Sequence, residues 1–413
     1  MTTRRRLLAA AGTGIGAALA GCASTLGRID RDPFDPDAPT ELDEFAATQF
    51  RLDLRNTGYV DATIPERVEV DWSMPVNRGE HTAAKSTPVA VDGDGTGEGD
   101  GDVLIAGDTG KLRRVRPDGT VRWTAAVEPV PRGIHGTPAV ANGSAYVGAY
   151  DGALYAFDLA TGERRWRTSI GDAIGSSPVY YNGIVYIAVE YAEPSGSVAA
   201  LDAATGEAHW VDGRPTDHPH STIALDREAG RLVVGSNDGV CYAWSFPDLD
   251  RAWTFETGGA IKGPVAARDG LAVFGSWDGR VYTVDVAGGS EVWSFAADGD
   301  VMSGAAITPD GTVYVGSHDS NLYALDLADG RERWRFDTGG LIIGSVTATR
   351  EHVLAGSYDT RMYALDAATG EETWYASGRG HATSAVLVTD GALYYAERSP
   401  GDRPGLCYRL VAR

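Results

Sequence analysis

Lysine and histidine side chains recur at one kind of position, just before a short run of small residues, threonine or proline. These positions are held by Lys85, His135, His220, Lys262 and His381. The chain has only three lysines and eight histidines, so two of the three lysines follow this pattern. Gathered at one site, such side chains supply both charge and donors to an anionic ligand. The alternative is that they only satisfy loop backbone groups, and the sequence leaves both interpretations open.

A second set of candidate ligands lies in the acidic segment 92–102, where carboxylates alternate with glycine. The residues are Asp92, Asp94, Asp100 and Asp102. Oxygen ligands at this spacing can wrap a hard cation, so the segment predicts a Ca²⁺ loop. It does not follow the EF-hand pattern, because Val103 stands where that pattern has glutamate. An acidic surface loop without an ion explains the same residues.

Other residues of reactive type have simpler explanations. His218 and His220 flank Pro219 and offer two nitrogen ligands, but two histidines alone are a weak metal signal. Cys241 and Cys407 fall where other repeats have Leu or Met, which predicts buried, inert thiols rather than a disulfide.

Tryptophan marks the elements that must position these side chains. Eight tryptophans recur at intervals of 51, 43, 44, 43, 40, 41 and 40 residues, at Trp72, Trp123, Trp166, Trp210, Trp253, Trp293, Trp334 and Trp374. This period is typical of a four-stranded propeller blade. Between the tryptophans, apolar strand segments alternate with Asn-Gly, Asp-Gly and Thr-Gly turns. The sequence therefore predicts an all-β protein, an eight-bladed β-propeller of four-stranded antiparallel blades.

The last repeat has only three strand-like segments, at 384–388, 392–396 and 406–410, whereas a strand-like segment at 67–74 precedes the first blade. We expect this N-terminal strand to complete blade eight, which closes the ring and leaves no open sheet edge. In this alignment the cationic positions rim the central channel. The turns on the same face carry Tyr150, Trp277, His318 and Tyr358.

The repeat motif Ala-x-Asp-x-x-Thr-Gly-x-x-x-Trp, seen from Ala156 to Trp166, resembles the tryptophan-docking repeat of the pyrroloquinoline-quinone-like (quinoprotein) β-propeller family. That family includes quinoprotein alcohol dehydrogenases and the propeller lipoprotein of the outer-membrane assembly machinery. The resemblance covers about residues 49–413. It implies that each tryptophan wedges between neighbouring blades over a Gly-containing turn. Burying such a ring removes roughly 150–250 Å² from water, which contributes at most ~4–6 kcal/mol.

The resemblance also implies what an enzyme of the family would need: the quinone over the channel, a Ca²⁺ ion, an aspartate base and a disulfide between adjacent cysteines. No two cysteines are adjacent here, and no Glu, Asn and Asp set maps onto the calcium ligands. We therefore expect a non-catalytic scaffold that binds a protein partner or an anionic small molecule. A pyrroloquinoline-quinone-dependent dehydrogenase of alcohols or sugars is the alternative.

The N-terminal residues predict an export signal. Arg4 and Arg5 precede an apolar run of about 14 residues, which is too short to span a bilayer and resembles a twin-arginine signal. Residues 19–22 resemble a lipobox that makes Cys22 the lipidated residue. We expect residues 1–22 to be this signal, 23–48 an acidic, proline-rich tether and 49–413 the propeller, anchored to the outer face of the cytoplasmic membrane.

The formal net charge of -21 excludes nucleic acid as an expected partner, because affinity for phosphates depends on neutralising them. Abundant carboxylates and scarce lysine resemble proteins from concentrated salt, where screening weakens self-repulsion; a GC-rich genome is the alternative explanation. We expect a monomer.

Overall fold

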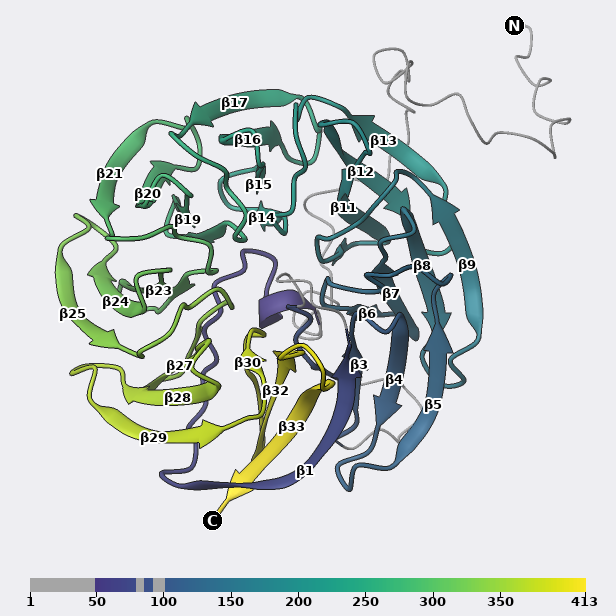
Figure 1. The fold of residues 1–413 in the computed structure, drawn as a ribbon. Coiled ribbons are helices and arrows are strands. Elements are labelled where there is room, and N and C mark those ends of the chain that lie inside the picture. The colour runs from purple at the N-terminus through teal and green to yellow at the C-terminus, as the bar shows by residue number, and fades with distance from the viewer. Residues whose placement is uncertain (1–48, 79–84, 92–100) are drawn as a thin grey trace, which may run out of the picture.

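Short strands separated by tight turns make up nearly all of the molecule. The computed structural model describes residues 49–78, 85–91 and 101–413, which contain 33 strands and the short 3-10 helix η1 (Phe50–Leu52). Figure 1 shows the strands as a ring of sheets around a central axis. Within the described residues, no helix is long and apolar enough to cross a membrane.

Blades one to four follow one another along the chain. Their strands are β2 (Val89–Ala90), β3 (Val103–Ala106), β4 (Lys111–Val115) and β5 (Val121–Ala126); β6 (Ala139–Ala141), β7 (Ser144–Gly148), β8 (Ala153–Asp158) and β9 (Arg164–Ser169); β10 (Val179–Tyr181), β11 (Ile184–Glu190), β12 (Gly196–Asp202) and β13 (Ala208–Asp212); β14 (Ala224–Asp226), β15 (Arg231–Gly235), β16 (Val240–Ser245) and β17 (Arg251–Glu256).

Blades five to seven repeat the arrangement. Their strands are β18 (Ala266–Arg268), β19 (Leu271–Gly275), β20 (Arg280–Asp285) and β21 (Glu291–Ala296); β22 (Ala306–Ile307), β23 (Thr312–Gly316), β24 (Asn321–Asp326) and β25 (Glu332–Asp337); β26 (Thr347–Ala348), β27 (His352–Gly356), β28 (Arg361–Asp366) and β29 (Glu372–Ser377). In each of these seven blades the strands pair antiparallel in chain order.

Blade eight joins the two ends of the described chain. It contains β31 (Leu387–Thr389), β32 (Ala392–Arg398), β33 (Gly405–Ala412) and, as its outermost strand, β1 (Val68–Asn77); β30 (His381–Ala382) pairs with the far end of β32. Strand β1 runs antiparallel to β33, with Val68 opposite Ala412. The predicted eight-bladed propeller and its closure by the N-terminal strand are both confirmed, and the closing strand runs three residues further than expected.

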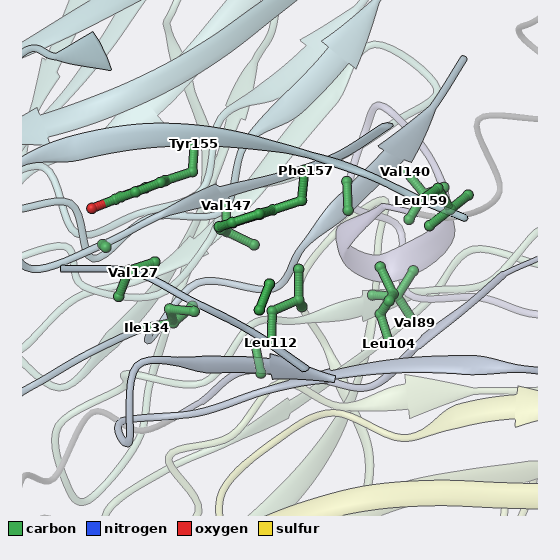
Figure 2. Close-up of a cluster of buried hydrophobic side chains, with 14 of the residues drawn as sticks. Val89, Leu104, Leu112, Val127, Ile134, Val140, Val147, Tyr155, Phe157 and Leu159 are labelled. Atoms are coloured by element: carbon green, nitrogen blue, oxygen red, sulfur yellow. The ribbon is translucent and has the colours of Figure 1, made fainter. Parts of the chain in front are cut away.

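The core consists of the interfaces between blades. The described residues form eight buried hydrophobic clusters, one at each junction of neighbouring blades, including the junction of blade eight with blade one. Figure 2 shows the junction of blades one and two, where Leu104 and Leu112 face Val147 and Phe157. Because each strand alternates its side chains between two faces, every blade contributes to two clusters.

The tryptophans of the repeat dock on the next blade, as Trp166 shows. The Trp166 indole donates a hydrogen bond to the Ala203 carbonyl (3.0 Å), and its ring covers Gly206, whose φ is +73°. A Cβ at Gly206 would lie 2.6 Å from the ring, so only glycine fits. The docking implied by the family resemblance is therefore present. At blade four, Leu249 takes the glycine position with φ +57° and forms the same turn through its hydrogen bond to Ser245.

The segment before β1 fills the middle of the ring, which the sequence did not predict. Its carbonyls accept hydrogen bonds from the innermost strands of four blades, as Leu54 from Leu225, Arg55 from Ala267, Thr57 from Ile307 and Gly58 from Ala348. The Asn56 amide donates to the carbonyls of Ile223 (2.9 Å) and Val265 (3.0 Å). Figure 1 shows η1 near the ring centre. We call residues 49–60 the plug.

Candidate functional site

A cavity of about 340 Å³ opens at the centre of the ring, with Phe50 of the plug in its lining. Two kinds of segment supply its walls: the connections that lead into the innermost strands, and the hairpins between the second and third strands of a blade. Eight of the nine residues predicted to rim the channel line this cavity: Lys85, His135, Tyr150, His220, Lys262, Trp277, His318 and Tyr358. Residues far apart in the sequence therefore meet at one site.

The ninth predicted residue, His381, is not part of the cavity lining. Its ring stacks on Tyr358, with centroids 4.2 Å apart, and its Nδ1 lies 2.6 Å from the Tyr358 carbonyl oxygen. Arg398 donates a hydrogen bond to the Tyr358 hydroxyl (2.9 Å). His381 thus positions Tyr358 from behind instead of facing a ligand.

The aromatic rings of the cavity lie next to its cations. The Lys262 ammonium is 3.7 Å from the centre of the Trp277 ring, and the centre of the His318 ring lies 6.3 Å from it. Trp277 is 38% exposed, which is unusual for so large an apolar side chain. His135 packs on Tyr150 at 4.3 Å, with the Arg132 guanidinium 5.5 Å above the tyrosine ring.

Burial weakens the charge of the two lysines. Burial and, to a lesser extent, the positive charge of Lys262 together lower the pKa of Lys85 to about 7. Burial also lowers the pKa of Lys262, against the opposing charges of Asp217, Glu190 and Asp300. These two ammonium groups face one enclosed space, so an anion placed between them would restore their charged forms.

The described lining residues include no aspartate or glutamate. The remaining wall is apolar and includes Met302, Leu341 and Ile343. Burial raises the pKa of Tyr150, as does the charge of nearby Glu190, so its hydroxyl stays neutral and can donate a hydrogen bond. The site therefore offers cations, donors and aromatic faces to an anionic group.

Behind the lining lies a residue that the sequence analysis missed, Glu190 at the end of β11. It is 4% exposed, and its Oε1 is 2.9 Å from Nδ1 of His220. Burial acts to raise the pKa of Glu190, but the hydrogen bond and charge of His220 and the charge of His218 outweigh it and hold that pKa below its usual value. One feature of the sequence could have drawn attention to Glu190. Residues 190–196 stand in blade three where other blades have an Asp-Gly hairpin.

Of the predicted calcium loop, only Asp102 lies within the described residues; Asp92, Asp94 and Asp100 lie outside them. Asp102 is buried, and its Oδ2 accepts hydrogen bonds from Arg114 (2.7 Å) and Arg122 (2.5 Å). This carboxylate is thus part of an ion pair inside blade one. Cys241 and Cys407 are both buried and free, and burial raises the pKa of each thiol.

Comparison with protein families gives a match over most of the ring. The family model described as outer membrane protein assembly factor BamB matches residues 108–243, 194–301 and 277–402. Among curated proteins, quinohemoprotein alcohol dehydrogenase of Comamonas testosteroni is 31% identical over 212 residues, which are 47% of this chain and 28% of the relative. BamB of Yersinia pestis is 30% identical over 199 residues, 44% of this chain and 47% of the relative. Each match spans less than half of the relative's length.

Solved structures show the same fold. The quinohemoprotein alcohol dehydrogenase of Comamonas testosteroni superposes with a TM-score of 0.71 at 17% identity, covering 88% of this chain and 80% of that one. BamB of Moraxella catarrhalis gives a TM-score of 0.64 at 18% identity, covering 84% and 100%. At such identities the likeness concerns the fold alone.

Proposed function

Because the chain belongs to the family of outer membrane protein assembly factor BamB, we propose that it is an extracytoplasmic, non-catalytic binding scaffold whose central cavity receives an anionic group. The ligand is either a small carboxylate or an acidic loop of a partner protein. The observation that carries this proposal is the meeting of Lys85 and Lys262 in one cavity with no carboxylate among its described lining residues.

The strong negative charge of the rest of the molecule supports an anion-binding role for this cavity. The chain carries a formal net charge of -21, so an anion is repelled by most of its surface. Only a local concentration of cations can overcome this repulsion. Two of the three lysines lie in the cavity, beside aromatic faces that can pack on the ligand's carbon atoms.

The test is calorimetry with two probes, citrate and a glutamate-rich peptide. We expect Lys85→Ala and Lys262→Ala each to weaken binding about 10-fold or more, since each removes a charge-assisted hydrogen bond. Lys111→Ala is the matched control, because Lys111 is the third lysine and lies exposed on β4. Binding of citrate alone points to a small-molecule ligand, and binding of the peptide alone to a protein partner. Unchanged affinity in both cavity variants would contradict the proposal.

We also propose that residues 1–22 form a twin-arginine-type lipoprotein signal and that Cys22 carries the lipid, with residues 23–48 as the tether. These residues lie outside the described ranges, and the proposal rests on their sequence. Radiolabelled palmitate should enter the wild-type protein and not Cys22→Ala, and the variant should be released from the membrane fraction. Palmitate incorporation into both proteins would refute the assignment.

A second candidate function is the quinone-dependent dehydrogenase. It is favoured by the similarity to quinohemoprotein alcohol dehydrogenases and by a cavity at the ring centre. The residues present do not fit that chemistry well. No described lining residue is a carboxylate that could act as base, and the two described cysteines lie in blades four and eight.

An absorbance spectrum with added pyrroloquinoline quinone and Ca²⁺, followed by a dye-linked assay with alcohols and sugars, separates the two functions. The scaffold proposal expects no substrate-dependent dye reduction. A saturable quinone band together with such reduction would replace the scaffold by the enzyme.

A further inference from the structure

Three side chains with metal-binding atoms converge at the wall of the central cavity. Glu190 ends β11, whereas His218 and His220 belong to the connection between β13 and β14. One ligand atom from each residue lies within 4.8 Å of the other two. The cluster therefore joins a strand of blade three to the loop that enters blade four, a combination that neither segment shows alone.

The loop that carries the two histidines is held in place by its backbone. The His218 carbonyl accepts hydrogen bonds from the amides of His220 (3.0 Å) and Asn237 (3.1 Å). The His218 side chain is oriented as well, because its Nε2 lies 2.8 Å from the Tyr191 carbonyl oxygen. That carbonyl can only accept, so Nε2 is the donor, and Nδ1 is the ligand atom that the neutral imidazole offers. Histidine ligands of metals are held by this kind of contact.

The cluster reaches the cavity beside Gly175. Gly175 has no side chain, and a Cβ built on it would lie 2.6 Å from Glu190 Oε1 and 2.9 Å from His220 Nδ1. The same point is 2.9 Å from the Tyr150 hydroxyl oxygen. Three polar atoms thus pack so closely against Gly175 that any side chain at this position would collide with them. Gly175, His220 and Tyr150 all line the cavity, so an ion held by the cluster is accessible from it.

We propose that Glu190, His218 and His220 form a site for a divalent transition-metal ion of the zinc type, open to the central cavity beside Gly175. Two imidazole nitrogens and one carboxylate oxygen suit such an ion, whereas Ca²⁺ and Mg²⁺ prefer oxygen ligands. Three protein ligands leave a coordination position open for a water molecule or an anionic ligand. This inference goes beyond the scaffold function, since the ion can bind without any ligand present.

The test uses the purified, chelator-treated protein with Zn²⁺ in a calorimeter and Co²⁺ in a visible spectrometer. We expect one ion per chain and a Co²⁺ absorption band of a four- or five-coordinate site. Glu190→Gln and His218→Gln should each weaken Zn²⁺ binding at least about 10-fold. Gly175→Ala keeps all three ligand residues, but its methyl group would lie 2.6 Å from Glu190 Oε1 and 2.9 Å from His220 Nδ1 and must displace them, so it should weaken binding as strongly.

His352→Gln is the matched control, because it removes a histidine from β27 in blade seven and should bind Zn²⁺ as the wild type does. Thermal unfolding checks that each variant is folded. It also gives a second measurement, since Zn²⁺ should raise the unfolding temperature of the wild type and the control only.

Three outcomes would overturn the proposal. They are the absence of Zn²⁺ and Co²⁺ binding, Zn²⁺ binding that survives all three cluster variants, or tighter binding of Ca²⁺ than of Zn²⁺. In the first case His220 and Glu190 are an ion pair and nothing more.

Discussion

The surroundings of Lys85 in the central cavity destabilise the charged form of its side chain. Burial and the nearby Lys262 bring its pKa to about 7, so the free protein holds Lys85 only partly protonated at neutral pH. A bound anion favours the charged form and raises this pKa. Ligand binding therefore takes up a proton at any pH between the free and the bound pKa values.

The first prediction follows from this linkage. Citrate affinity should be highest at and slightly below pH 7 and should fall above it by up to about 10-fold per pH unit, until the pKa of the bound state is reached. Calorimetry between pH 6 and pH 9 measures the slope. Lys85→Arg keeps its charge throughout this range, so its profile should be much flatter. An equally steep profile in this variant would show that another group controls the pH dependence.

Single residues also show which parts of the site the local sequence pattern could predict and which it could not. The position before the innermost strand identified Lys85, His135, His220 and Lys262 as neighbours, and all four line the cavity. The same pattern misplaced His381, because its ring turns onto Tyr358. Glu190 went unrecognised since its importance depends on His220, which is 30 residues away and in the connection to another blade.

Within a blade, some tight turns only reverse the chain, whereas others also receive the tryptophan of the preceding blade. Blade five has one glycine of each kind, so the two contributions can be measured separately. Gly270 and Gly289 have nearly the same φ, +78° and +74°. A Cβ at Gly270 would meet no atom within 4 Å, whereas one at Gly289 would lie 2.5 Å from the Trp253 ring of blade four. At a matching φ, the two glycines thus differ in whether an added methyl group meets a neighbouring atom.

We therefore predict unequal effects of the same substitution. Gly270→Ala should cost about 1 kcal/mol of unfolding free energy, the strain of a positive φ. Gly289→Ala should cost about 1–3 kcal/mol more, because the methyl group displaces the docked indole. Urea unfolding of both variants at one salt concentration gives the difference. Equal costs would mean that the tryptophan contact contributes nothing at this junction.

The number and type of elements followed from the sequence because a blade is a local unit. Its four strands are joined by hairpins of a few residues, and each hairpin carries its own Asn-Gly, Asp-Gly or Thr-Gly signal. Glycine is not essential at every one of these turns. Leu249 occupies the glycine position of blade four with a positive φ, and the turn still forms. The neighbouring pattern still identified the blade correctly.

Across the whole molecule, the plug is hydrogen-bonded to the innermost strands of blades four, five, six and seven. Asn56 is 1% exposed, and its amide bridges the Ile223 and Val265 carbonyls of two different blades. Its φ of +54° is tolerated by asparagine and by glycine. Substitution by glycine thus removes the amide without adding backbone strain.

We predict that Asn56→Gly lowers the unfolding free energy by about 1–3 kcal/mol, because two buried carbonyls lose their donor. Asp269→Gly is the control, since Asp269 has a similar φ of +53° but lies exposed in a hairpin. Chemical unfolding of both proteins makes the comparison. An effect of Asn56→Gly no larger than that of the control would show that the plug does not tie the blades together.

The amino-acid sequence by itself determined the all-β class, the eight blades, the closing N-terminal strand and the face on which cations gather. These are consequences of a short repeat, whose turns and docking residues act on their nearest neighbours. Only the tertiary structure decided that Phe50 of the plug lines the cavity and that Glu190 meets His220 beside Gly175. These contacts depend on how neighbouring blades are rotated relative to one another and on where the plug crosses the ring. The spacing of residues along the chain encodes neither of these.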